Sequence, residues 1–306
     1  MRIVVHGQQA FGKSVLEALL ERGEEVIAVY CAPEKEGQRT DPLKEAALAH
    51  QLPVYQPRSF RKQEVWDELA ALKADLCVMA YVTLFVPEEA LHLPTHGTIQ
   101  YHPSLLPRHR GPSSINWPIL WGESKTGLTI FWPDNGLDTG PILLRKEIDI
   151  QDTDTLGSLY FNQLFPMGVD ALLEAVDMVR NGTAPKIPQD ESLATYESWC
   201  KQEHAEIDWT KPVSEVWNIM RGADPQPGAW STYDGQTVQL YDGRKWMGES
   251  AGAPGEVMAI GEESMTVAAQ GGQIEVQRVR PAGGKKISAA EFASHVGLRQ
   301  GSRLGS

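Results

Sequence analysis

The side chains best suited to chemistry in this sequence lie in two short stretches, residues 98–117 and 133–140. Gln100 and His102 are two residues apart in an apolar run typical of a strand, so their side chains should lie on the same side of a sheet. Pro103 ends that strand directly after His102. The histidine is therefore expected at the carboxyl end of a strand, where open α/β sheets bind ligands.

A carboxylate is expected to reach His102 through the next strand. The pattern after His102 predicts a helix over 113–122 and a strand over 127–132, and such a crossover brings its second strand near the first. The loop that follows contains Asp138. A carboxylate within about 4–6 Å of an imidazole favours its charged form. A His102–Asp138 pair would stabilise an oxyanion or move a proton, and Gln100 would add a neutral donor.

Each of these groups also has an ordinary structural interpretation. A single histidine at a strand end often serves only as a hydrogen-bonding group of the fold, and Asp134 lies in a turn-forming D-N-G sequence. The stretch "PRHRG", residues 107–111, fits either a solvated basic loop or a loop that attracts an anionic substrate. His92 and His96 are four residues apart, but Pro94 disfavours a helix between them. No metal site is expected.

The elements that must position these residues follow from the periodicity of the chain. Short runs rich in Val and Ile alternate with helical patterns over the first half, which predicts a Rossmann-like, mostly parallel, doubly wound α/β sheet. A long helix is expected from about 155 to 181, with Gly182 as its stop signal. The expected domains are a catalytic domain over 1–181, a polar, proline-containing linker over 182–203 and a small β-rich domain over 204–306.

Composition limits the class of protein. The 306 residues, 42% of them hydrophobic, allow two domains with buried cores. A net charge of -12 and a pI near 5.2 argue against a protein that coats nucleic acid or anionic membranes nonspecifically. Cys31, Cys77 and Cys200 are far apart, which indicates neither a disulfide framework nor a zinc site. A cytoplasmic protein without a membrane segment is expected.

The stretch "GQQAFGKS", residues 7–14, matches the phosphate-binding pattern G-x-x-x-x-G-K-[ST] between an expected strand and an expected helix. Its inner positions, 8–11, lack the additional glycines that help backbone N–H groups surround a phosphate. No second strand ends in a convincing acidic ligand for Mg²⁺. A plain strand-to-helix turn without ATP is the preferred interpretation, and a P-loop nucleotide-binding protein is the remote alternative.

Taken together, the motifs resemble those of the formyltransferases that use 10-formyltetrahydrofolate. The resemblance is strongest to the hydrolase domain of 10-formyltetrahydrofolate dehydrogenase and extends to methionyl-tRNA formyltransferase. The family pattern is matched by His102, Ser104 to Pro107, Arg110-Gly111 and Gly136 to Gly140, and the spacing of 36 positions from His102 to Asp138 agrees with it. "GQQAFG", "HAEIDWTKP" and "RPAGGKKISAAEF" extend the resemblance over most of the chain.

The resemblance implies a formyltransferase fold with a β-barrel-like (OB-like) C-terminal domain and a role in one-carbon metabolism. The enzyme would pass the formyl group of 10-formyltetrahydrofolate to water, as a hydrolase, or to a small amine, with neither a metal nor NAD(P). By resemblance, His102 is the general acid and oxyanion stabiliser, and Asp138 is its charge partner. The implied folate-binding residues are Leu84, Phe85, Val86, Ser104, Leu105, Leu106, Pro107 and Asp138.

Position 100 departs from the family. Most formyltransferases have Asn there, and the dehydrogenase-type hydrolase domains have an apolar residue. Gln100 carries the same amide as Asn one methylene further out. It is therefore expected to act as a third catalytic residue beside His102 and Asp138.

Methionyl-tRNA formyltransferase is the alternative function, and charge bears on it because tRNA phosphates require Lys and Arg contacts. Between residues 31 and 50, three basic residues oppose four acidic ones, a balance of 3 - 4 = -1. From 278 to 306, six basic residues oppose Glu291 alone, a balance of 6 - 1 = +5. The basic C-terminal segment keeps initiator tRNA as an alternative acceptor. The residues counted are Glu34, Lys35, Glu36, Arg39, Asp41, Lys44, Glu45, Arg278, Arg280, Lys285, Lys286, Glu291, Arg299 and Arg303.

Overall fold

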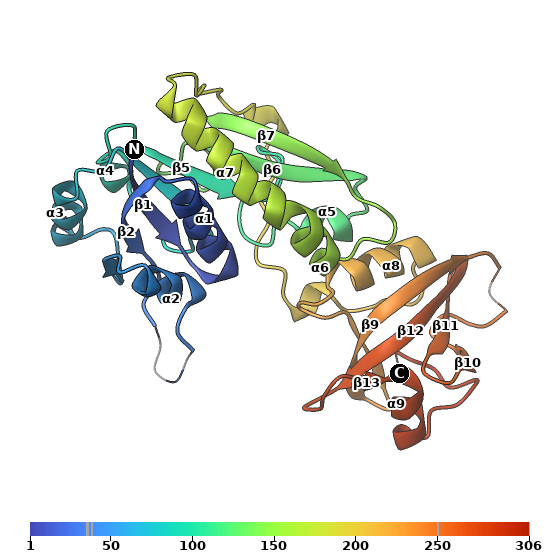
Figure 1. The fold of residues 1–306 in the computed structure, drawn as a ribbon. Helices are drawn as coiled ribbons and strands as arrows, with labels where there is room; N and C mark the ends of the chain where they lie inside the picture. Colours follow the sequence, from blue (N-terminus) through green and yellow to red (C-terminus); the bar gives the residue numbers. More distant parts are fainter. Residues whose placement is uncertain (35–36, 38, 250, 306) are drawn as a thin grey trace. The chain divides into compact units, whose positions relative to one another are not determined.

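The computed structural model describes residues 1–34, 37, 39–249 and 251–305 (Figure 1). Lys35 and Glu36, which enter the charge balance above, lie outside the described residues. The chain forms two compact units, and each unit is built from several segments. Unit 1 comprises Met1–Gly111, Gly127–Ile148 and Asn162–Tyr196, and unit 2 comprises Pro112–Thr126, Asp149–Phe161 and Glu197–Ser306. The boundaries predicted after residues 181 and 203 stay a prediction.

Unit 1 is organised around a seven-stranded sheet with the strand order β3-β2-β1-β4-β5-β6-β7 (Figure 1). The strands from β3 to β5 pair in parallel, which confirms the predicted mostly parallel α/β sheet. Its strands are β1 (Arg2–Gly7), β2 (Glu25–Tyr30), β3 (Val54–Tyr55), β4 (Leu76–Ala80), β5 (Thr98–His102), β6 (Lys125–Phe131) and β7 (Ile142–Asp149). Its helices are α1 (Gln9–Glu21), α2 (Pro42–Ala49), α3 (Gln63–Ala71), α4 (Glu88–Leu91) and α7 (Phe165–Arg180).

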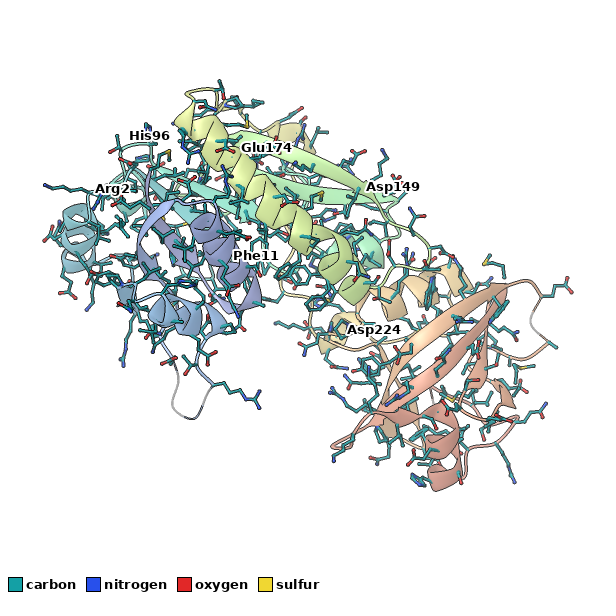
Figure 2. All side chains as sticks on the ribbon, viewed as in Figure 1. Arg2, Phe11, His96, Asp149, Glu174 and Asp224 are labelled. Atoms are coloured by element: carbon teal, nitrogen blue, oxygen red, sulfur yellow. The ribbon has the colours of Figure 1, made fainter. Side chains whose placement is uncertain are left out.

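Alternate residues of the central strands supply two cores, one on each face of the sheet. Ile3 and Val5 pack into the core that includes residues of α1, α2 and α7, whereas Val4 packs into the core that includes residues of α3 and α4. This alternation follows from the two-residue period of a strand. Phe11 of α1, labelled in Figure 2, lies in the first core with its ring centroid 4.4 Å from that of Tyr101.

The direction of β6 differs from the prediction. β5 and β6 are antiparallel, with His102 opposite Thr129 and Gln100 opposite Phe131. The carboxyl end of β6 therefore lies beside Gln100, not beside the end of β5. The loop from 132 to 141 must turn back along the sheet to reach His102. The expected proximity to His102 is thus obtained by a different route from the predicted parallel crossover.

The predicted long helix is present but changes its hydrogen-bonding pattern near its start. α6 (Leu156–Leu159) leads into a π-helical turn, η1 (Tyr160–Leu164), and then into α7. Thr155 caps the start, because its side chain accepts a hydrogen bond from the Ser158 N–H. Gly182 follows the end with φ of 67°, a left-handed conformation that glycine adopts without strain. Throughout the described ranges, no helix has the length and apolar character needed to cross a membrane.

Unit 2 contains an antiparallel sheet with the order β10-β11-β12-β9-β8, and β13 pairs with β12. Its core includes Trp209, Trp217, Val276 and Phe292. This curled sheet confirms the predicted β-rich second architecture. Its strands are β8 (Trp230–Tyr233), β9 (Gln236–Met247), β10 (Val257–Ile260), β11 (Met265–Ala269), β12 (Gly272–Pro281) and β13 (Ile287–Ser288). Its further helices are α5 (Asn116–Leu120), η3 (Gln202–His204), α8 (Val213–Gly222) and α9 (Ala289–Val296).

The turn between β1 and α1 explains the first glycine of the phosphate-loop pattern. A Cβ on Gly7 would lie 2.2 Å from the Ala80 carbonyl oxygen, so this glycine allows β1 and β4 to approach. The N–H of Gln9 donates to both carboxylate oxygens of Asp41, at 3.0 and 2.9 Å. A carboxylate therefore lies where a phosphate loop would bind an anion, and Lys13 instead pairs with Glu17.

Buried His6 predicts an acid-sensitive contribution to stability. Its ring is 4.7 Å from that of Phe60, and burial lowers the pKa of His6 to about 3. In the unfolded chain a histidine has a pKa of about 6.5. As the pH falls through 6.5, the unfolded state therefore binds a proton that the folded state does not, and stability falls until about pH 3.

Between pH 7 and pH 5, His6 should cost about 2 kcal/mol of unfolding free energy. A His6→Met variant, measured by urea titration at both pH values, should lose about that much less than the wild type. Equal losses in the two proteins would contradict this prediction, since all other titrating groups are shared.

Candidate active site

Strand β5 places Gln100 and His102 on one face of the sheet. Ile99 and Tyr101 point into the core formed with α1 and α7, so Gln100 and His102 face the opposite side. Thr98 is on that same side, where its hydroxyl donates to the Leu91 carbonyl of α4 at 2.7 Å. Gln100 and His102 thus share the face that contains α4.

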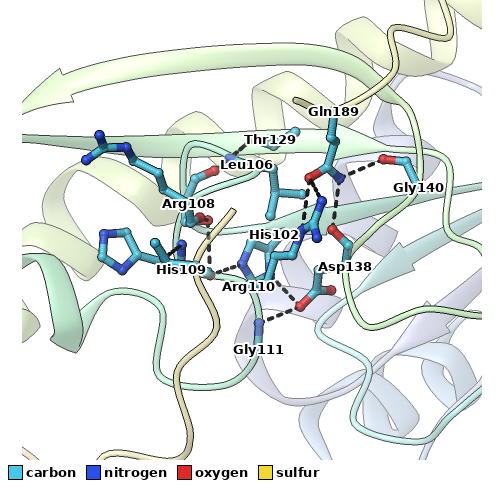
Figure 3. A network of polar contacts seen from close by, with 12 residues as sticks. His102, Leu106, Arg108, His109, Arg110, Gly111, Thr129, Asp138, Gly140 and Gln189 are labelled. Atoms are coloured by element: carbon cyan, nitrogen blue, oxygen red, sulfur yellow. Dashed lines mark hydrogen bonds and ion pairs between the residues drawn. The ribbon is translucent and has the colours of Figure 1, made fainter. Parts of the chain in front are cut away.

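The orientation of His102 is set by two contacts on opposite sides of the ring (Figure 3). Its Nε2 lies 2.8 Å from the carbonyl oxygen of His109, and a carbonyl can only accept, so Nε2 carries a proton. Its Nδ1 lies 3.7 Å from Oδ2 of Asp138. That distance is too long for a direct hydrogen bond. If both nitrogens of His102 carry protons, Nε2–H faces the His109 carbonyl and Nδ1–H faces the Asp138 carboxylate.

The Asp138 side chain is buried and held by a main-chain donor. The N–H of Gly111 donates to Oδ2 at 2.8 Å, which fixes the oxygen that faces His102. Asp138 itself has φ of 57°, a left-handed conformation that is uncommon outside glycine. Asp134 has the structural role considered above, because Oδ1 accepts from the Gly136 N–H and the Thr139 hydroxyl within the turn. The structure therefore brings His102 and Asp138 together, as predicted.

Arg110 and Gln189 hold the Asp138 loop, although the sequence pointed only to Arg110, as part of a motif, and not to Gln189. Arg110 has no exposed surface, so "PRHRG" is not simply a solvated basic loop. Its guanidinium donates to Gln189 Oε1 and to both carboxylate oxygens of Glu191. Gln189 in turn donates to the main-chain carbonyls of Asp138 and Gly140, at 2.8 and 2.7 Å (Figure 3). No sequence motif marks Gln189, because it lies in the polar, proline-containing stretch that was predicted to be a linker.

The segment from Leu84 to Val86 directly precedes α4, whose first residue contacts the loop that contains Asp138. The N–H of Glu88 donates to Asn135 Oδ1, and Asn135 Nδ2 donates to the Glu88 carboxylate, both at 3.0 Å. These contacts link the start of α4 to the loop. Phe85 is 46% exposed, with the Arg61 guanidinium 5.1 Å from the centroid of its ring, whereas Val86 is buried.

The turn from Ser104 to Pro107 is largely buried, and Leu105 is its partly exposed residue. Ser104 and Leu106 have no exposed surface. The Ser104 hydroxyl donates to the carbonyl oxygen of Arg108 at 2.7 Å, and Thr129 Oγ1 accepts from the Leu106 N–H. This network positions the His109 carbonyl that orients His102. The Ser104 and Leu106 side chains are thus not exposed for direct contact with a ligand.

The arrangement offers a proton donor and a free amide side by side. The Gln100 side chain forms no hydrogen bond to any residue that the structure describes, and it is partly exposed. An oxyanion near β5 could accept hydrogen bonds from Gln100 and a protonated His102, with Asp138 balancing the charge. Among the described residues, no three His, Cys, Asp or Glu side chains are grouped to hold a metal ion.

Fold and site together define a class of protein that comparison with known families identifies. Residues 1–176 match the formyl transferase family and residues 200–297 match the formyl transferase C-terminal domain. The chain belongs to the formyl transferase family and is an enzyme of that class.

Several relatives are similar over much of the chain. Mitochondrial 10-formyltetrahydrofolate dehydrogenase of Mus musculus is 44% identical over 246 residues, which is 79% of this chain but 26% of the dehydrogenase. The chain thus spans about a quarter of that relative. Methionyl-tRNA formyltransferase of Geobacter sulfurreducens is 37% identical over 310 residues, covering 100% of this chain and 97% of the relative. HypX from Aquifex aeolicus, solved with tetrahydrofolic acid, shares the fold with a TM-score of 0.72 at 22% identity, covering 96% of this chain and 47% of HypX.

Proposed function

We propose that this enzyme uses 10-formyltetrahydrofolate and transfers its formyl group to water or to a small amine. The observation that carries this proposal is the His102–Asp138 pair beside a free Gln100 amide. The relatives support this substrate class, because two are named for formylated or reduced folates and a third for formyl transfer.

In the proposed reaction, the nucleophile attacks the formyl carbon and the carbonyl oxygen becomes an oxyanion. The Gln100 amide and the Nδ1–H of protonated His102 donate to that oxygen, because Nε2–H already donates to the His109 carbonyl. The Asp138 carboxylate, 3.7 Å from Nδ1, balances the charge of the ring. The bond from the carbon to N10 of the folate then breaks, and the proton that the nucleophile loses passes to N10. Water as the nucleophile yields formate and tetrahydrofolate, and an amine yields a formamide and tetrahydrofolate. The exposed Phe85 ring, with Leu84 and Leu105, is proposed to contact the pterin.

A specific observation keeps initiator tRNA as the second candidate acceptor. Arg278 and Arg280 lie on β12, and Lys286 follows close by with its ammonium 3.8 Å from the centroid of the Tyr241 ring. This group of cations would attract phosphates. The similarity to a methionyl-tRNA formyltransferase over 97% of its length agrees with this alternative.

The acceptor can be identified by measuring tetrahydrofolate production from 10-formyltetrahydrofolate. The reaction is run in water alone, with a panel of small amines, and with methionyl-initiator tRNA. A formate-producing rate that acceptors do not raise supports the hydrolase. A rate that rises only with charged tRNA replaces it with the second candidate. No turnover under any of the three conditions contradicts the proposed function.

Gln100 should contribute through its amide. We expect Gln100→Leu to lower turnover about tenfold or more, because one oxyanion donor is lost, with little change in KM for the folate. Gln100→Asn should retain more activity than Gln100→Leu, since it keeps the amide. Steady-state kinetics of the three proteins decide this, and full turnover in Gln100→Leu would assign the oxyanion to other donors.

A further inference from the structure

The segment from Gln189 to Tyr196, here called the strap, contacts Asp138 and the turn that orients His102. It lies in unit 1 and pairs with the turn that follows β5, through a bridge between Arg110 and Tyr196. The Arg110 N–H donates to the Thr195 carbonyl at 3.0 Å, and the His109 N–H donates to the Thr195 hydroxyl at 2.8 Å.

On the histidine side, the strap acts through a main-chain carbonyl. The carbonyl of His109 accepts from His102 Nε2, and the N–H of the same residue is held by Thr195. The Thr195 N–H also donates to the Pro107 carbonyl. The strap thereby fixes the turn whose carbonyl orients the His102 ring.

On the aspartate side, the strap acts through one side chain. Both hydrogens of the Gln189 amide are used, one on the Asp138 carbonyl and one on the Gly140 carbonyl. Its oxygen accepts from Nε and Nη2 of Arg110, at 3.1 and 2.8 Å. The amide cannot rotate by 180° without turning its oxygen toward two carbonyls and its hydrogens toward a guanidinium.

The charge of Arg110 holds this arrangement in place. A guanidinium without exposed surface requires acceptors for its donors, and Glu191 and Tyr196 provide those that Gln189 does not. The ion pair with Glu191 raises the pKa of Arg110 and lowers the pKa of the Glu191 carboxyl. Because Arg110 adjoins Gly111, whose N–H donates to Asp138 Oδ2, both ends of Asp138 are tied to one short segment.

We propose that Gln189 is a positioning residue for catalysis, held by Arg110, which sets Asp138 at the distance from His102 that the reaction needs. This inference rests on the proposed function. A displacement of about 1 Å in a catalytic group can cost about a hundredfold in rate. Loss of the Gln189 amide should therefore affect turnover far more than folate binding.

The test uses two substitutions in the whole 306-residue chain. Gln189→Glu keeps acceptors for Arg110 but removes both donors to the 138–140 loop, and Gln189→Met removes all four contacts at similar length. We expect both to lower kcat by about 10- to 100-fold, with KM for 10-formyltetrahydrofolate changed less than about threefold. Gln63→Glu, an exposed glutamine of α3, is the matched control and should keep wild-type kinetics.

A double variant separates positioning from general damage. If Gln189 acts through Asp138, Gln189→Glu combined with Asp138→Asn should turn over no more slowly than Asp138→Asn alone. Losses that multiply, or wild-type kcat in Gln189→Glu, would overturn the proposal. If Gln189→Met fails to fold, Gln189→Glu decides.

A second readout does not depend on the reaction. In ¹⁵N-labelled protein, the Gly111 amide resonance reports its hydrogen bond to Asp138. We expect it to shift in Gln189→Glu and to stay in place in Gln63→Glu. An unmoved resonance refutes the positioning role even if the wild type proves inactive toward 10-formyltetrahydrofolate, whereas wild-type inactivity with a shifted resonance refutes only the proposed function.

Discussion

His102→Asn and Asp138→Asn are each expected to lower turnover of 10-formyltetrahydrofolate by about 10² to 10³. This is the typical cost of removing one oxyanion-stabilising group. His102 faces the proposed oxyanion, and Asp138 lies 3.7 Å from its Nδ1. Because the two act as a unit, the double variant should be little slower than the slower single variant. Turnover is measured at saturating folate.

The controls for this prediction are exposed residues of the same types. His96→Asn and Asp67→Asn should leave turnover unchanged, since both side chains lie on the surface of unit 1. Folate affinity, measured by fluorescence titration, should largely survive His102→Asn. A His102→Asn protein with most of its turnover would return this histidine to a purely structural role.

Gly140→Ala should abolish most activity through the backbone alone. A Cβ at Gly140 would lie 1.8 Å from the carbonyl oxygen of Trp132 and 2.9 Å from its carbon. Neither is the end of a flexible side chain, so the loop must open. Its closing hydrogen bond from the Trp132 N–H to the Pro141 carbonyl would be strained as well. Since Asp138 is two residues away, we expect at least about a hundredfold loss of turnover.

Thermal unfolding and kinetics measured together check this result. Gly140→Ala should also have a lower melting temperature, because a packed backbone contact is replaced by a clash. Gly261→Ala is the matched control, since its new Cβ would come no closer than 3.3 Å, to the Ser264 hydroxyl. Wild-type kinetics in Gly140→Ala would show that the loop can adapt without moving Asp138.

The sequence indicates that helices cover a buried sheet, but it does not indicate the direction of each strand in that sheet. Alternation of Val- and Ile-rich runs with helical patterns predicted the sheet of unit 1 because each strand buries both of its faces. The direction of β6 leaves no such trace, since an apolar run reads the same in either orientation. The helix expected over 113–122 is only Asn116–Leu120, where Pro118 and the turn at Gly122 limit its length.

The site was predictable where its residues share a strand or a motif. Gln100 and His102 alternate on β5, and the loop containing Asp138 carries a motif of its own. Gln189 and Glu191 carry neither signal, because a polar, proline-containing stretch looks the same whether it is solvated or bound. Arg110 contacts Gln189 and Glu191 across 79 and 81 residues of sequence. No local pattern in a single sequence reveals contacts between residues so far apart.

Because the two units are built from interleaved segments, parts of unit 2 are synthesised long before the residues that they pack against. Buried Asn116 donates to the carbonyl of Gly222, 106 residues later, and the Trp117 indole donates to the carbonyl of Ser198. During synthesis, α5 therefore leaves the ribosome long before α8 exists to cover it. A nascent chain would expose this apolar segment to chaperones while unit 1 is still incomplete. A fragment ending at residue 203 would keep residues 112–126 and 149–161 permanently without the rest of their unit.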